Sequence, residues 1–449
     1  MALSIDVLYI IYQQLETDID RVNFRKMCTS TYHFPQIINR SCTIKQIEEH
    51  TKCKFTNLKM TSIADFLYLQ GVQIIQYITS LTCSGLGITN LPNMPNIRVL
   101  DCSNNNIVQL PPMRLKSLIC SHNLLTQLPY MPLVSLTCDF NRLTSLPEMP
   151  LVELCCSHNL ITQLPDMPLK KLVCDNNRLI QLPNMPLVEL VCVNNSISQI
   201  PEMPLLEKLD CGCNIITQLP NMPMMKILDC SFNLITQLPD MPLLTDLDCR
   251  HTFVSEISNM PSLKKLYCMA PNFLKISDVP SLVYLDCSGN ISELPDMPQL
   301  KNLICIRMPL TQLPHMPQLT SLFCNSTRIT EISGMPLLKC ITCNNNNISV
   351  IQNVENVTEL RCRHNKLTQL PYMPSIELLD CSMNELTQLY DMPHLVELHC
   401  YGNNISVLPN IPLIKELRCY DTNITSLPDM PHIEYLDCRI PGIPNINID

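Results

Sequence analysis

The chain contains no tryptophan, only eight glycines among its 449 residues, and few aromatic residues of any kind. The scarcity of glycine excludes the glycine-rich loops with which many enzymes cradle phosphate groups. No run of 18 uninterrupted apolar residues occurs, so we predict no membrane-spanning helix. Asp6 interrupts the apolar start of the chain and no basic residues precede it, so we expect no secretory signal.

Charge is sparse as well, because charged residues make up 16% of the chain and the net charge is −9. So modest a charge argues against binding to a nucleic-acid phosphate backbone. The histidines are scattered, and no set of nucleophile, acid and base emerges from the residues. We therefore predict that the protein is not an enzyme, needs no cofactor or metal, and binds neither nucleic acid nor a membrane.

Cysteine, in contrast, is abundant, and its spacing reveals a repeat. Twenty of the 26 cysteines, from Cys83 to Cys438, follow one another at intervals of 18 or 19 residues. Around each recurs the frame L-x-x-L-x-C-x-x-N-x-[IL]-[ST]-x-[LI]-P-x-M-P, which residues 115–132 show in full. Self-similarity at so short a period predicts a solenoid of stacked turns.

The twenty repeat cysteines occupy equivalent positions, so no pairing between neighbouring turns is preferred. We predict a reduced interior column of small apolar side chains and a cytoplasmic protein. An extracellular receptor is the alternative, and it requires oxidised cysteines and glycosylated sequons such as those at Asn290 and Asn404. The remaining cysteines lie outside the column: Cys28, Cys42, Cys53, Cys155, Cys213 and Cys340.

Each repeat combines a short strand with an extended return. Alternation places Leu118 and Cys120 inside, and Ile119 and Ser121 outside. The asparagine three residues after each cysteine, such as Asn123, is expected to bond backbone groups at the turn, and losing such a partner costs about 1–3 kcal/mol. The two prolines of L-P-x-M-P exclude a helix or an inner strand, so we predict a polyproline-II-like return.

The frame resembles that of the leucine-rich-repeat family, L-x-x-L-x-L-x-x-N-x-L, with cysteine in place of the last leucine before the asparagine. The resemblance covers roughly residues 75 to 441 and implies a parallel β-sheet on a concave face with the returns on the convex side. In length and return, the repeats resemble those of bacterial effector proteins more than the helix-backed repeats of ribonuclease inhibitors. We assign residues 81–449 to a solenoid of about 20 repeats.

Seven repeats lack the asparagine, and four of them fall between residues 249 and 327. We expect the solenoid to be least regular there, either as a bend or through relaxed constraint on the sequence. The seven replacements are Leu86, Thr252, Pro271, Met308, Thr327, Thr422 and Pro441.

The positions next to each cysteine predict what the concave face displays. Asp210, Asp229 and Asp248 form an acidic ladder, which we interpret as solvated carboxylates because no oxygen cage for a cation accompanies them. Arginine and tyrosine, which are enriched at interface hot spots, gather in the last repeats. We predict that this cluster binds a target protein through an acidic segment. Its members are Arg361, Arg363, His364, His399, Tyr401, Arg418, Tyr420 and Arg439.

The first 40 residues lack the repeat and show helical spacing of apolar residues. The stretch from Ile5 to Phe34 resembles an F-box, with Ser4-Ile5 in place of the usual Leu-Pro start, Asp18 in the acidic step and Cys28 near the end. The resemblance implies that the apolar residues of this segment contact a Skp-family adaptor. These residues are Val7, Leu8, Ile11, Leu15, Ile19 and Val22.

Residues 41–80 are expected to form a helical cap over the first open turn, and Thr43 with Gln46 matches a capping box. The F-box resemblance, with residues 1–40 as the module, implies a substrate receptor of a cullin–RING (SCF-type) ubiquitin ligase. Its target would bind the concave face. In its repeat style and composition the chain resembles F-box proteins with repeats from large DNA viruses. This resemblance implies that the protein is located in the cytoplasm of the host cell. The alternative is a binding scaffold without a ubiquitin connection, whose whole N-terminus is a cap.

Overall fold

The computed structural model describes residues 57–59, 78–270, 273–439 and 446–447. The chain divides into two compact units, Met1–Ser196 and Ile197–Asp449, called here the N-terminal and C-terminal units. The predicted F-box-like module at residues 1–40 lies outside the described residues, as does almost all of the predicted helical cap at residues 41–80.

In the N-terminal unit the strands pair in chain order, each parallel to the one before it. They are β1 (Asn57–Lys59), β2 (Ser80–Thr82), β3 (Val99–Asp101), β4 (Ser117–Ile119), β5 (Ser135–Thr137), β6 (Glu153–Cys155), β7 (Lys171–Val173) and β8 (Glu189–Val191). Because β1 pairs with β2, the sheet extends into the segment predicted as the cap.

In the C-terminal unit the main sheet is also parallel and in chain order, except at its last strand. Its strands are β9 (Lys208–Asp210), β10 (Ile227–Asp229), β11 (Asp246–Asp248), β13 (Lys265–Met269), β15 (Tyr284–Ser288), β16 (Asn302–Cys305), β17 (Ser321–Phe323), β19 (Cys340–Thr342), β21 (Glu359–Arg361), β22 (Leu378–Asp380), β23 (Glu397–His399), β24 (Glu416–Arg418), β25 (Tyr435–Asp437) and β26 (Ile446–Asn447). Four shorter strands lie on the returns: β12 (Glu256–Ile257), β14 (Lys275–Ile276), β18 (Glu331–Ile332) and β20 (Val350–Ile351).

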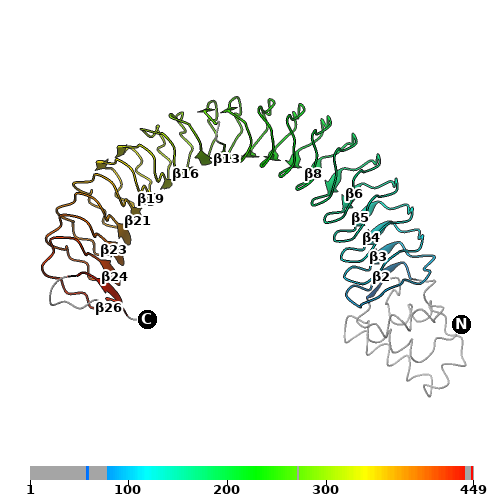
Figure 1. Ribbon diagram of the computed structural model, residues 1–449, viewed down its shortest axis with the longest axis horizontal. Coiled ribbons are helices and arrows are strands. Elements are labelled where there is room, and N and C mark those ends of the chain that lie inside the picture. The colour runs from blue at the N-terminus through cyan, green and yellow to red at the C-terminus, as the bar shows by residue number, and fades with distance from the viewer. Residues whose placement is uncertain (1–56, 60–77, 271–272, 440–445, 448–449) are drawn as a thin grey trace, which may run out of the picture. The chain divides into compact units, whose positions relative to one another are not determined.

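Within each unit the strands line the concave side and the returns form the opposite side (Figure 1). Leu118 and Cys120 are fully buried, and Ile119 between them is exposed, as the alternation predicts. All twenty repeat cysteines are buried, and none of them forms a disulfide. Ser121, however, was predicted to face outward and is buried, because its short side chain does not reach past its neighbours. The parallel pairing of strands from successive repeats confirms the solenoid predicted from the sequence, and the described residues contain no helix.

The change from 18-residue to 19-residue repeats alters one turn of the return. In four consecutive 18-residue repeats of the N-terminal unit the leucine after M-P donates its amide to the methionine carbonyl two residues earlier, as Leu133 does to Met131 over 2.7 Å. In the 19-residue repeats the amide of Leu206 donates to Met203, three residues earlier, over 3.0 Å. One extra residue after M-P thus converts a γ-turn into a β-turn. The N-terminal unit consists mostly of the shorter form, and the C-terminal unit of the longer.

The section between residues 249 and 327 is where the solenoid departs most from its frame. Strands β13 and β15 lengthen to five residues each. On the returns, isoleucine-serine replaces leucine-proline, which restores the amide that proline lacks. The amide of Ser277 therefore donates to the carbonyl of Ile257 over 2.9 Å, and β12 pairs with β14 in a second, short ladder.

The predicted asparagine ladder is present. The side-chain amide of Asn123 donates to the carbonyls of Cys102 and Cys120 over 3.0 and 3.1 Å, and its oxygen accepts from the amide of Ile107 over 2.9 Å. Asn123 therefore joins its own turn to the preceding one. Where threonine replaces the asparagine at Thr252, the hydroxyl bonds the carbonyl of Cys249 within the same turn over 2.7 Å.

The C-terminal edge of the sheet is covered by the chain itself. Strand β26 pairs antiparallel with β25 and places Ile446 opposite Leu436. An uncovered parallel edge offers unpaired backbone groups to other chains, so this reversal protects the last repeat.

Candidate functional site

The strand face, defined as the side chains three residues before, one residue before and one residue after each repeat cysteine, is held in strict register. Asp210, Asp229 and Asp248 are direct partners across β9, β10 and β11. Their carboxylates accept hydrogen bonds from backbone amides. Asp229 accepts from the amide of Ser231 over 2.9 Å, and Asp248 accepts from the amide of Arg250 over 3.0 Å. The acidic ladder therefore caps the chain as it leaves each strand, which explains it without a cation.

The end of the C-terminal unit carries a continuous strip of flat side chains, called here the arginine–tyrosine ladder: Arg363, Tyr401, Tyr420 and Arg439. The rings of Tyr401 and Tyr420 stack with centroids 4.5 Å apart and planes 13° apart. The guanidinium of Arg363 lies 5.5 Å from the centre of Tyr401, and that of Arg439 lies 4.4 Å from the centre of Tyr420. Ser382, which follows the repeat cysteine between Arg363 and Tyr401, is completely buried.

The other charged residues predicted for this cluster lie one column away, before the cysteines. Arg361, His399 and Arg418 occupy this column, with Asp380 and Asp437 in register among them. Arg361 pairs with Glu359, two residues before it on the same strand. Arg418 likewise pairs with Glu416 over 2.8 Å, and Arg439 approaches Asp437 at 3.9 Å.

These ion pairs change the electrostatic expectation for the cluster. The cluster was predicted to bind an acidic segment, but each of Arg361, Arg418 and Arg439 has a carboxylate of its own chain beside it. Exposed pairs of this kind contribute little to stability, but they weaken the local positive field. What distinguishes the strip from the rest of the strand face is its flat aromatic centre between two guanidinium groups.

His364 lies one position further along the chain than Arg363, two residues after its repeat cysteine. Its backbone has a φ of 60° at the turn that follows β21, and the side chain is exposed. The same turn position carries stacked rings elsewhere, where Phe140 lies between His122 and His158 with centroids 4.3 and 4.1 Å apart. This stack was not predicted from the sequence, although aromatic residues two places after successive cysteines are a signal for it.

Two functional candidates were also missed on the strand face itself. Glu397 and Glu416 precede their cysteines by three residues and lie in direct register. His399 Nε2 is 2.9 Å from Glu416 Oε1 and 3.5 Å from Glu397 Oε1. Burial raises the pKa of Glu416, but the hydrogen bonds from His399 and Arg418 outweigh it and lower the pKa below its ordinary value. Glu416 is therefore a carboxylate at neutral pH.

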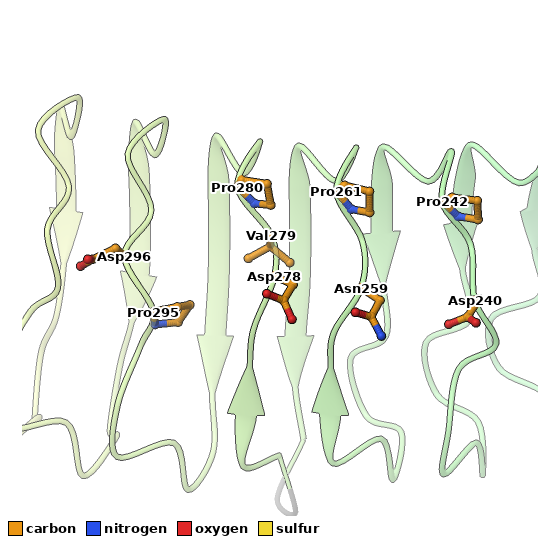
Figure 2. Close-up of a pocket in the computed structure, with 9 residues that line it drawn as sticks. All are labelled: Asp240, Pro242, Asn259, Pro261, Asp278, Val279, Pro280, Pro295 and Asp296. Carbon is orange, nitrogen blue, oxygen red and sulfur yellow. The ribbon is translucent and has the colours of Figure 1, made fainter.

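The return side of the C-terminal unit carries a groove of about 820 Å³. Figure 2 shows a row of prolines from successive turns beside a parallel row of polar side chains. Asn259 and Asp278 in the polar row have φ values of 57° and 53°, a left-handed conformation that asparagine and aspartate tolerate better than most residues. The groove is lined by Asp240, Pro242, Asn259, Pro261, Asp278, Val279, Pro280, Pro295 and Asp296.

Repeat length, strand register, the asparagine ladder and the helix-free returns together define a leucine-rich-repeat solenoid. The structure is similar to that of YopM from Yersinia enterocolitica, with 27% sequence identity, a TM-score of 0.62, and coverage of 81% of this chain and 91% of that one. It also shares its fold with a leucine-rich-repeat protein of Leptospira interrogans, at 20% identity and a TM-score of 0.54, over 73% of this chain and 94% of the other.

No protein-family model and no curated protein matches the sequence. None of the described residues belongs to a helix that could cross a membrane.

Proposed function

We propose that this protein is a cytoplasmic binding scaffold that holds a partner protein on the strand face of its C-terminal unit. The observation that carries this proposal is the arginine–tyrosine ladder, in which four side chains stack into one strip. Tyrosine and arginine are the residues that most often dominate binding energy at interfaces. Parallel strands fix these side chains before a partner arrives, so little entropy is lost on binding.

The chemistry of the strip defines the partner segment. The stacked rings of Tyr401 and Tyr420 offer an amphipathic surface for an apolar or aromatic side chain. Arg363, whose side chain is exposed, and Arg439 stand at the two ends and favour a carboxylate at each end of the bound segment. The target is therefore an extended segment with acidic residues flanking an apolar one, rather than a uniformly acidic tail.

Comparative capture from eukaryotic lysate tests this proposal. The full chain is compared with Arg363→Glu and Tyr401→Ala variants, and with Lys366→Glu as a matched control, because Lys366 is exposed just beyond the ladder. Proteins that bind the ladder should be recovered by the parent and the control and depleted with both ladder variants. If all four baits recover the same proteins in the same amounts, the strip is not the binding surface.

The ligase interpretation is the finer form of this proposal, and the resemblance of residues 5–34 to an F-box supports it. In that form the N-terminal segment recruits a Skp-family adaptor and a cullin, and the strand face selects the substrate. A Leu8→Glu, Ile11→Glu double variant of the full chain should lose the adaptor and keep the ladder-dependent partner. If adaptor and cullin are absent from the parent chain too, the protein is a scaffold without a ubiquitin connection.

A further inference from the structure

The side chains of Glu397, His399 and Glu416 converge on one point of the strand face. Glu397 and His399 are two residues apart on β23 and face the same side, while Glu416 lies opposite Glu397 on β24. One ligand atom from each residue lies within 4.8 Å of the other two. Both carboxylates approach the same imidazole nitrogen, Nε2, at 2.9 and 3.5 Å. Rigid, paired strands thus hold three potential metal ligands together.

These distances fit the coordination chemistry of a divalent transition metal. Zinc binds histidine nitrogen and carboxylate oxygen at about 2.0–2.2 Å, so two ligands of a tetrahedral site lie about 3.4 Å apart. The 3.5 Å between His399 Nε2 and Glu397 Oε1 already matches this edge. The 2.9 Å between His399 and Glu416 is a hydrogen bond in the absence of metal. It must open by a few tenths of an ångström, which a glutamate side chain accommodates by rotation.

The surroundings permit an ion to enter and be held. The side chain of His399 is 16% exposed and those of both glutamates are 32% exposed. The site is therefore partly buried but still open to an ion from solvent. Two carboxylates in register repel each other, and a dication relieves this repulsion. Arg418 also contacts Glu416, but its guanidinium lies 4.9 Å from the ring centre of Tyr435 and keeps that contact if Glu416 turns away.

We propose that Glu397, His399 and Glu416 bind a first-row divalent transition metal, with zinc as the metal that suits them best. Three protein ligands leave the fourth tetrahedral position open to water or to a donor from another molecule. Nitrogen with carboxylate oxygen favours zinc over calcium or magnesium, which prefer all-oxygen shells. This site is separate from the arginine–tyrosine ladder and does not depend on the proposed partner.

Cobalt(II) absorption spectroscopy followed by zinc competition on the full chain tests the site. Cysteine binding is the main competing signal, so the measurements use a Cys213→Ser background, which removes an exposed thiol. Cobalt bound by glutamate and histidine gives visible d–d bands without the intense thiolate charge-transfer band. The parent should show this spectrum with one cobalt per chain, and zinc should displace it.

His399→Gln and Glu416→Gln should each weaken zinc binding by more than about 100-fold, since even loss of a residue behind the ligands costs about 10–100-fold. His394→Gln is the matched control, because His394 is exposed five residues earlier in the same turn and is not among the three ligands. Thermal unfolding in metal-free buffer verifies that all variants are folded. The proposal is overturned if the parent binds no cobalt, if a thiolate band dominates, or if affinity survives in His399→Gln.

Discussion

Tyr401 and Tyr420, each two residues beyond the end of its strand, stack face to face with ring centroids 4.5 Å apart, although they are 19 residues apart in sequence. The repeat length sets this contact, because each turn returns the position after its cysteine to the same place on the next strand. Burial raises the pKa of the Tyr420 hydroxyl, and the neighbouring Tyr401 adds to that rise.

The stack should contribute measurably to stability. A double-mutant cycle with Tyr401→Ala and Tyr420→Ala is expected to give a coupling free energy of about 0.5–1.5 kcal/mol, as for other stacked aromatic pairs. Chemical denaturation of the four proteins measures it. Tyr372, exposed on a return, provides the comparison pair, and its replacement should be additive with Tyr401→Ala. Coupling near zero for the stacked pair would contradict the packing described here.

The asparagine ladder predicts that replacing two adjacent asparagines, Asn403 and Asn404, changes the free energy of unfolding by very different amounts. Asn403 is buried, accepts from the amide of Leu386 over 3.0 Å and donates to the carbonyls of Cys381 and Cys400, each over 3.0 Å. Asn403→Ala leaves these groups unpaired and should lower the free energy of unfolding by at least about 2 kcal/mol. Asn404 beside it is exposed, and Asn404→Ala should change the urea midpoint little. Equal effects would mean that the ladder does not stabilise the solenoid.

Alanine substitution is predicted to be much more damaging at Gly289, in the least regular section of the solenoid, than at Gly212. The φ of Gly289 is 135°, and a Cβ there would lie 2.6 Å from the carbonyl oxygen of Ala270. Gly289→Ala should therefore destabilise the C-terminal unit by about 1–3 kcal/mol. At Gly212 the nearest atom is the movable Oγ of Ser231 at 3.3 Å, so Gly212→Ala should be tolerated much better. Thermal unfolding midpoints compare the two, and a mild effect at Gly289 would contradict the close approach.

The cysteine column predicts a large spread in thiol reactivity. Burial raises the pKa of the Cys83 thiol to about 12, with Asp101 adding to it, and burial likewise raises the pKa of Cys174 well above its ordinary value. Because the thiolate is the reactive form, column cysteines should resist alkylation at pH 8 until the chain is unfolded. Cys213 is exposed and should be alkylated in the native protein. Site-by-site mass spectrometry measures this, and rapid native labelling of Cys174 would disprove the buried column.

The sequence alone predicted the solenoid, its buried leucine and cysteine columns and the asparagine ladder, because these depend on residues that recur in every turn. Features that depend on a local departure from the repeat frame were harder to predict. The ladder between β12 and β14 forms only where proline is lost, and the antiparallel β26 pairs without any repeat signal. The predicted target-binding residues other than His364 did meet on the strand face, but the carboxylates beside them were not foreseen, since Glu359 and Glu416 belong to another column of the frame.

The register also limits how the arginines can be tested. Arg418 contacts Glu416 over 2.8 Å, so reversing its charge places two carboxylates together and disturbs the strand face itself. Arg363, in contrast, rests on the ring of Tyr401 and is exposed, which makes it the better position for a probe.

The most direct measurement is photo-crosslinking in cells with a photoreactive amino acid in place of Arg363, compared with the same group in place of Tyr372 on the return side. Binding on the arginine–tyrosine ladder predicts a discrete crosslinked partner from position 363, lost when Tyr401→Ala and Tyr420→Ala are added, and none from position 372. The same partner crosslinked from position 372 and not from position 363 would show that the protein binds through its returns, and the strand-face account would be wrong.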